Sequence, residues 1–157
     1  MRDILFRAKI INSDKWVEGG YCESAETTYC CKEDYERNPV PIHHYIVVDR
    51  MTDWGMPNEL TLHRVKADTV CQYTGQKDKN GKKIFEGDIL EAHLDDRYPD
   101  DITRVTVEFV NGGWKTRQGD LLPDTFEDED GKTWTVVGNM FDNPELVESG
   151  VVDEKNQ

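Results

Sequence analysis

The first half of the chain holds cysteine and histidine residues of the types that bind zinc. They are Cys22, Cys30, Cys31, His43, His44, His63 and Cys71. Structural zinc sites usually take their ligands in pairs two to four residues apart, and no such pair is present. His43 and His44 are neighbours on an expected strand, so they point to opposite faces. The spacing therefore predicts free thiols and no bound metal, with a zinc site in this segment as the alternative.

The residues Asp78-Lys79-Asn80-Gly81 resemble the centre of a calcium-binding EF-hand loop, in which acidic ligands precede a sharp glycine turn. If Gly81 holds the sixth position, Gln76 holds the first and Gly87 the twelfth. The first ligand and the closing bidentate glutamate are then both missing. The motif predicts a turn, and we expect no cofactor.

Two arrangements of residues have the types needed for catalysis. Cys71 with His44 or His63 is a possible nucleophile and base, but no helix N-terminus or basic neighbourhood activates the thiol. Acidic clusters offer paired carboxylates to a metal-dependent hydrolase, although such runs are usually solvated loops. These clusters are Asp95-Asp96, Asp100-Asp101 and residues 127–130. The sequence predicts no catalytic residue, and a metal-dependent enzyme that uses the acidic loops or the Cys and His segment is the alternative.

Four lysines make one basic spot on an acidic chain: Lys77, Lys79, Lys82 and Lys83. The whole chain carries 32 acidic and 19 basic residues, a net charge of −13. Binding to a phosphate backbone requires basic groups that displace counterions, so nucleic acid is an unlikely partner. A strongly acidic protein instead favours basic partners, which makes a DNA mimic that binds a basic host protein a further alternative.

The elements that position these residues are predicted to be strands. Asn80-Gly81 is typical of the two central positions of a type I′ turn, so residues 73–74 and 84–85 form a hairpin. Further strands are expected from alternating apolar residues, and Asn111-Gly112-Gly113 marks a second hairpin. The expected strands cover residues 4–11, 16–22, 42–49, 60–65, 89–94, 102–110 and 133–138. A bulge or a close backbone approach is expected at Gly19-Gly20, and a bend or a bulge at Gly87.

Helices are expected only as short pieces, at residues 32–37 and near the C-terminus, where Asn143 is the N-cap and Pro144 the first helical residue. The predicted fold is therefore mainly β, an antiparallel sheet or small β-barrel of hairpins with a short C-terminal helix. We expect one domain over residues 1–150 and a frayed tail at 151–157.

No apolar run approaches the ~18 residues that span a bilayer, and no signal peptide is evident. A soluble protein that is not exported is expected, so the four cysteines would stay reduced.

Three stretches resemble the YopX family of phage and prophage proteins. They are Ile4-Leu5-Phe6-Arg7-Ala8, the central run over residues 72–89, and the closing run over residues 135–146. The residues that carry the resemblance in the last two runs are called the signature residues below: Tyr73, Thr74, Gly75, Asp78, Asn80, Gly81, Phe85, Glu86, Gly87, Asp88, Gly138, Asn139, Asn143 and Pro144. The resemblance implies a compact, mostly β phage protein that acts in the bacterial cytoplasm, and it supplies no catalytic residue. The match is weak between residues 22 and 66, so a variable insert or lobe is expected there.

The predicted function is a non-enzymatic binding or accessory protein of a phage or prophage. Its partner would be an unknown host or phage protein, and a homo-oligomer is possible from the sequence.

Overall fold

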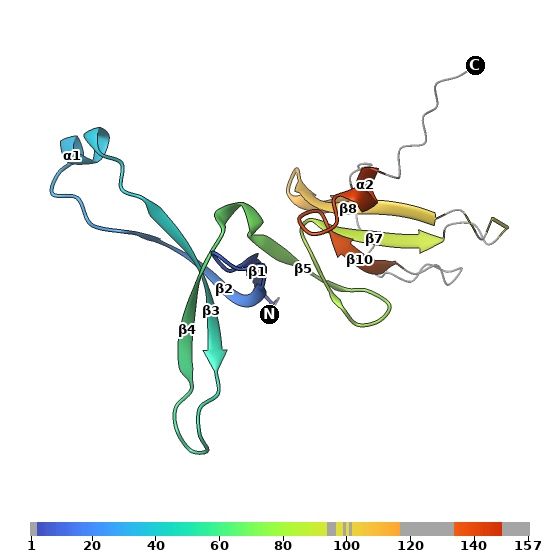
Figure 1. Ribbon diagram of the computed structural model, residues 1–157, viewed down its shortest axis with the longest axis horizontal. Coiled ribbons are helices and arrows are strands. Elements are labelled where there is room, and N and C mark those ends of the chain that lie inside the picture. Colours follow the sequence, from blue (N-terminus) through green and yellow to red (C-terminus); the bar gives the residue numbers. More distant parts are fainter. Residues whose placement is uncertain (1–2, 94–96, 99, 101, 117–133, 149–157) are drawn as a thin grey trace. The chain divides into compact units, whose positions relative to one another are not determined.

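A computed structural model describes residues 3–93, 97–98, 100, 102–116 and 134–148. Ten strands form two antiparallel sheets, with strand orders β4-β3-β2-β1-β5-β6 and β10-β7-β8-β9 (Figure 1). Neither sheet closes into a barrel within this described part of the chain, so the mainly β prediction is confirmed in its open-sheet form. The chain divides into two compact units, residues 4–72 (the N-terminal unit) and residues 73–157 with 1–3 (the C-terminal unit).

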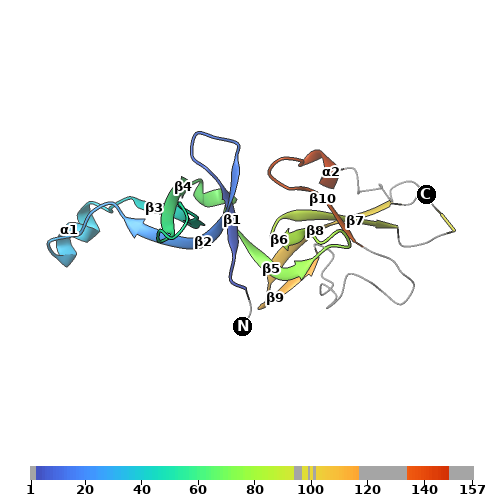
Figure 2. The ribbon, with the colours of Figure 1, turned by 90° about the horizontal axis from the view of Figure 1, so that it is seen from below.

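The N-terminal unit is a meander of antiparallel strands. Its elements are β1 (Phe6–Lys9), β2 (Trp16–Ala25), α1 (Lys32–Arg37), β3 (Ile42–Arg50), β4 (Glu59–Val65), the 3₁₀ turn Ala67–Thr69 and the start of β5 (Cys71–Lys77). The short helix α1 lies within the connection between β2 and β3, beyond the ends of these two strands (Figure 2). It covers the predicted residues 32–37, and each predicted strand of this unit is found with its ends moved by a few residues.

One face of this sheet carries the core of the N-terminal unit. Ala8, Ile46 and Val65 are buried, and partly buried apolar side chains pack around them. These are Phe6, Val17, Tyr21, Val48 and Val70. The alternation along each strand explains the set, because residues two apart point to the same face. The close approach expected at Gly19-Gly20 holds for Gly19, where a Cβ atom would lie 2.1 Å from the carbonyl oxygen of Val47.

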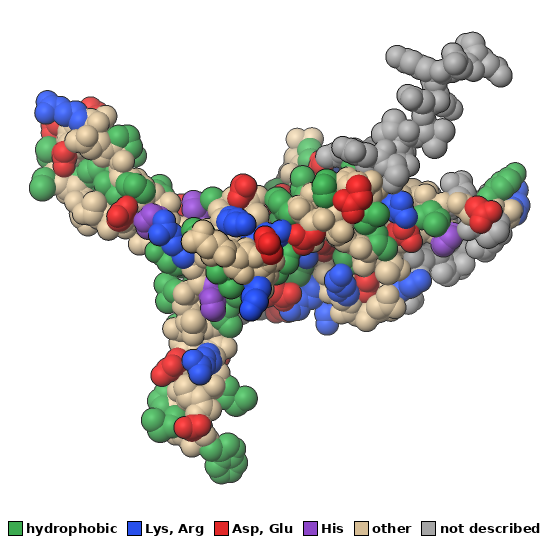
Figure 3. Space-filling model, viewed as in Figure 1, with side chains coloured by type: hydrophobic (Ala, Val, Ile, Leu, Met, Phe, Trp, Pro, Cys, Tyr) green, Lys and Arg blue, Asp and Glu red, His purple; other side chains and the backbone are tan. Residues whose placement is uncertain are grey.

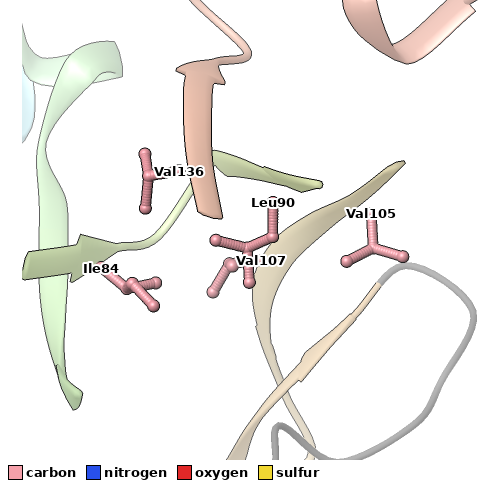
Figure 4. Close-up of a cluster of buried hydrophobic side chains, with 5 residues drawn as sticks. All are labelled: Ile84, Leu90, Val105, Val107 and Val136. Carbon is pink, nitrogen blue, oxygen red and sulfur yellow. The ribbon is translucent and has the colours of Figure 1, made fainter. Parts of the chain in front are cut away.

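The C-terminal unit contains the rest of β5, then β6 (Lys83–Phe85), β7 (Asp88–His93), β8 (Ile102–Val110), β9 (Gly113–Thr116), β10 (Thr135–Asn139) and α2 (Glu145–Glu148). Five buried side chains from four strands form its core, with Trp114 and Trp134 packed against them (Figure 4). They are Ile84 of β6, Leu90 of β7, Val105 and Val107 of β8, and Val136 of β10.

The two Asn-Gly pairs form different turns. At the β8–β9 hairpin, Val110 pairs with Gly113 and the two residues between them have φ of 52° (Asn111) and 81° (Gly112), the type I′ pattern. At the β5–β6 hairpin only Gly81 has positive φ, and its amide donates to the Asp78 carbonyl at 2.9 Å. The type I′ prediction for Asn80-Gly81 is therefore wrong, and the loop is a four-residue turn whose last residue is the left-handed glycine.

Some predictions fall on residues that the structure does not describe. These are the acidic residues 95–96, 101 and 127–130, the end of the β7 strand at Leu94, and the tail 151–157. The single-domain boundary at residue 150 stays a prediction. The C-terminal helix is present as α2, which begins at Glu145, one residue after the predicted Pro144.

Candidate interaction site

Asp78 is buried at the end of β5, and its carboxylate holds the β5–β6 turn together. Its side chain is 6% exposed. Oδ1 accepts the backbone amides of Asn80 at 2.8 Å and Lys82 at 2.9 Å, and Oδ2 accepts that of Val136 at 3.1 Å. An ionised carboxylate makes stronger hydrogen bonds than a neutral acceptor. The same side chain thus folds its own turn and fastens it to β10, 58 residues further along the chain.

Two more buried polar signature residues act on the backbone of their own region. The Thr74 hydroxyl donates to the Ile84 carbonyl at 2.9 Å and accepts the Gln76 amide at 3.2 Å. Asp88 is fully buried, and its Oδ2 accepts the Phe85 amide at 2.8 Å across the Glu86-Gly87 turn. Buried backbone groups need such partners, because an unsatisfied one costs about 1–3 kcal/mol.

Gly87 joins this turn to the closing segment of the chain. Its φ is +76°, its amide donates to the Val107 carbonyl and its carbonyl accepts the Met140 amide, both at 2.8 Å. A Cβ atom here would lie 3.2 Å from the Met140 side chain and 3.3 Å from Phe141. The position therefore requires glycine for its backbone conformation and for space, which explains the bend predicted there.

The closing signature residues form a second turn after β10. Asn139 Oδ1 accepts the amides of Phe141 and Asp142, both at 3.0 Å. The Asn143 side chain packs on Gly138, where a Cβ atom would lie 2.5 Å from Asn143 Oδ1. Leu146 donates its amide to the Asn143 carbonyl at 3.1 Å, which starts α2 after Pro144.

The signature residues therefore belong to one scaffold in the C-terminal unit. The Tyr73 and Phe85 rings pack at 5.5 Å between centroids, and burial together with the charge of Asp3 raises the pKa of Tyr73. Gly75, with φ of +92°, stands where the β5–β6 register shifts between Tyr73 and Lys77. Asp78, Thr74, Asp88 and Asn139 bond backbone amides or carbonyls of their own unit, and Asn139 also bonds the side chain of Asp142.

The cysteines and histidines of the possible zinc set lie apart in the fold. No group of three or more metal-binding side chains occurs among the residues that the structure describes. Cys30 and Cys31 are exposed just before α1, whereas Cys71 is buried and donates its thiol to the Thr69 carbonyl at 3.3 Å. Cys22 and His63 lie on β2 and β4. All four cysteines are free thiols in this structure.

His43 and His44 enter two different networks on β3. His43 Nδ1 is 2.8 Å from an Arg64 guanidinium nitrogen, which can only donate, so His43 accepts there and turns its Nε2 to Glu26. His44 Nδ1 is 2.6 Å from the Tyr21 hydroxyl, which donates its proton to Glu23 at 2.8 Å. His44 must then donate from Nδ1. The two rings thus use Nδ1 in opposite roles, His43 as acceptor and His44 as donor. Their separate networks are expected for side chains on opposite faces of one strand.

Tyr21 stays protonated well into the alkaline range. Desolvation by burial, together with the hydrogen bond to Glu23 and its negative charge, raises the pKa of Tyr21 to about 12. The hydroxyl is therefore a permanent donor to Glu23 at neutral pH.

The predicted lysine-bearing hairpin end is present in the C-terminal unit. Lys77 and Lys83 pair across β5 and β6, and Lys79 and Lys82 are exposed in the turn between them. Asp78 is the buried residue among them.

The end of the β3–β4 hairpin exposes large apolar side chains, and residues 51–58 are called the β3–β4 tip below. Trp54 is 104% exposed, Met51 82% and Met56 64%. Leu60 and Leu62 of β4 continue the exposed apolar surface up one face of the hairpin. Figure 3 shows hydrophobic side chains gathered at this end of the N-terminal unit, with acidic and basic groups beside them.

The β3–β4 tip is an ordered loop. The Met56 amide donates to the Asp53 carbonyl at 3.0 Å, and Gly55 at the third position of this turn has φ of +77°, the type II pattern. The Thr52 hydroxyl donates to the Pro57 carbonyl at 2.7 Å, and Asn58 Nδ2 donates to Asp49 at 3.2 Å. Trp54 occupies the second turn position and is held outward by the backbone.

Residues 51–58 fall between the expected strands 42–49 and 60–65, and no role was predicted for them from the sequence, so this surface was missed. A usable signal was present, since Met51, Trp54 and Met56 fall within six residues of an otherwise polar connection. Large exposed apolar patches on a soluble protein mark sites of interaction.

The family model described as YopX protein matches residues 5–148, nearly the whole chain. The chain belongs to the YopX family. Among solved structures, this YopX chain is similar to the crystal structure of protein EF1440 from Enterococcus faecalis, with a TM-score of 0.53 and 23% sequence identity. The match covers 94% of this chain and 99% of that one, and it shows a shared fold. The comparison with curated proteins found no match. None of the helices in the described residues has the length and apolar character to cross a membrane.

Proposed function

We propose that this YopX protein is a non-enzymatic, phage- or prophage-encoded binding protein that acts in the bacterial cytoplasm. It contacts a host or phage protein through the β3–β4 tip. The observation that carries the proposal is the fully exposed Trp54 on an ordered turn, flanked by the exposed Met51 and Met56.

The exposed residues suit a protein interface. Tryptophan is enriched among the residues that dominate binding energy, and methionine adapts to irregular partner surfaces. Burying about 200 Å² of a tryptophan at about 25 cal/mol per Å² yields about 5 kcal/mol before the costs of association. Such a gain is large compared with the binding free energy contributed by the residues that surround most interface centres, which is close to zero.

The fixed turn lowers the cost of binding. Ordering a loop on association consumes conformational entropy, whereas a preformed loop has already lost it on folding. Two hydrogen bonds, from Met56 to Asp53 and from Thr52 to Pro57, close the β3–β4 tip without a partner. The free protein therefore presents the backbone of the turn, and with it the Cα–Cβ direction of Trp54, in one orientation.

The test compares capture of partner proteins from host lysate by the wild-type chain, by Trp54→Ser and by Tyr98→Ser. Tyr98 is a matched control, because it is an exposed aromatic residue (63%) in the C-terminal unit. We expect a discrete partner with the wild-type and Tyr98→Ser proteins and its loss with Trp54→Ser. Equal capture by all three proteins would show that the β3–β4 tip is not the binding surface.

A further inference from the structure

The β3–β4 tip forms an open hollow of about 610 Å³, lined by residues 50–53 and 56–59. A volume of this size admits a side chain or a short peptide segment, since small-molecule sites span about 300–1,000 Å³. The whole lining comes from one closed loop of the N-terminal unit. The hollow is thus part of the ordered β3–β4 tip.

Apolar and charged side chains line the hollow. Met51 and Met56 supply flexible apolar surface, Asp53 and Glu59 supply two carboxylates, and Arg50, which pairs with Glu59 across β3 and β4, supplies one guanidinium. Trp54 follows Asp53 in the same turn, and its side chain is fully exposed. Over residues 49–59 three acidic residues face one basic residue, Arg50. An apolar wall next to carboxylates matches a long basic side chain, whose stem is aliphatic and whose end is charged.

We infer that this hollow receives a lysine or arginine side chain of a basic partner protein, with Trp54 packed against it. The inference rests on the proposed function and names the chemistry of its partner. The methionines would contact the aliphatic stem, the carboxylates of Asp53 and Glu59 would bind the cationic end, and the indole face of Trp54 adds a cation–π contact.

The charge of the chain argues against the other surfaces that attract an exposed tryptophan. Anionic lipid headgroups and nucleic-acid phosphates both repel a protein of net charge −13. The N-terminal unit alone carries 11 acidic and 8 basic residues, a net charge of −3, so its own field has the same sign. A basic protein surface is attracted both by this field and by the lining of the hollow.

The test uses a five-residue peptide of alternating leucine and arginine with blocked ends, and its analogue with the arginines replaced by neutral citrulline. Both are titrated into the full chain carrying ¹³C-methyl methionine, whose four methionines include Met140 in the C-terminal unit as an internal control. We expect the arginine peptide to shift the Met51 and Met56 signals saturably and to leave Met140 in place.

The doubly neutralised variant Asp53→Asn with Glu59→Gln preserves the shape of the hollow and removes its charge. We expect it to lower the affinity for the arginine peptide about tenfold and to leave the affinity for the citrulline peptide unchanged. This difference would show that the lost affinity comes from the interaction between the carboxylates and the arginines. The unfolding temperature of the variant is measured alongside, and an unchanged value shows that the loop still folds.

Several results would overturn the inference. Equal binding of the two peptides at Met51 and Met56 would show an apolar site without charge selection, and the proposed function would survive. Shifts at Met140 alone, or no saturable shift, would remove the hollow as a site, while the capture experiment decides the proposed function separately. A dimer in sedimentation velocity that is lost in Trp54→Ser would replace the basic partner with a second copy of the chain. Binding to anionic vesicles that is lost in the same variant would replace it with a lipid surface.

Discussion

The β5–β6 turn and the β3–β4 tip are two hairpin ends of the same chain with opposite chemistry. In the β5–β6 turn the carboxylate of Asp78 is buried and accepts three backbone amides. In the β3–β4 tip the carboxylate of Asp53 lines an open hollow, and Trp54 is fully exposed. The first end holds several of the signature residues, whereas the second lies in the segment 22–66, outside them. At the first end the polar side chain stabilises the fold, and at the second the side chains are left open to a partner.

The largest effect is expected from Asp78→Ala. It leaves the amides of Asn80, Lys82 and Val136 without their acceptor, so the free energy of unfolding should fall by about 2–4 kcal/mol. Urea denaturation followed by circular dichroism measures this loss. Asp53→Ala in the β3–β4 tip is the matched control and should change stability by less than about 0.5 kcal/mol.

Asp78→Asn refines this comparison. Asparagine has only one acceptor oxygen and cannot satisfy both the turn amides and Val136. An intermediate loss is expected. Equal stability of wild type and Asp78→Ala would contradict the structural role of the carboxylate.

The next largest effect is expected from Gly87→Ala. The alanine must adopt a φ of +76° and place its Cβ 3.2 Å from Met140, which should cost about 2–3 kcal/mol. Gly112→Ala has a similar φ of +81° but meets no atom within 4 Å, so it should cost only about 1 kcal/mol. Thermal unfolding of the two variants separates the two causes of the lost stability, the contact with Met140 and the positive φ. Equal losses would show that Met140 moves aside freely.

A smaller effect distinguishes the two Asn-Gly pairs. Asn111→Ala places alanine at a φ of +52° and should destabilise the protein by about 1 kcal/mol. Asn80 has no positive φ in the structure, so Asn80→Ala should cost less than about 0.5 kcal/mol. Denaturation midpoints of the two variants measure the difference. A larger loss at Asn80 would restore the type I′ assignment for the β5–β6 turn.

The smallest effect on stability is expected from Trp54→Ser. The side chain is fully exposed, so its removal should change the unfolding temperature by less than the error of the measurement while it abolishes partner capture. Calorimetry on the purified variant checks the unfolding temperature. A marked destabilisation would mean that Trp54 serves the fold, as the signature residues do.

The sequence was a good guide to secondary structure and a poor one to the site. Strand positions followed from alternating apolar residues, and β8 was predicted to the residue at 102–110. The turn at Asn80-Gly81 was misjudged because the carboxylate of Asp78 imposes a different loop by accepting two amides of the turn. Local propensity cannot predict the hydrogen bond that the Val136 amide donates to Asp78, because Val136 lies on a strand 58 residues away. Exposure of Trp54 is likewise a tertiary property, since the same residue types in a loop are equally able to pack inward.

The close approach at Gly19 bears on how the chain avoids mispairing as it folds. Strands β2 and β3 are joined by 16 residues, so their pairing costs the closure entropy of a connection that is long for a hairpin. A slip by one residue would turn every side chain to the wrong face, but a slip by two keeps the faces and would cost little by hydrophobic pattern alone. Such a slip brings Val17 or Tyr21 to the position of Gly19, where at the native strand spacing a Cβ atom would lie 2.1 Å from the Val47 carbonyl oxygen. The strands would have to move apart there to accept the shifted register, so the bare glycine backbone favours the native pairing over one that hydrophobicity alone would accept.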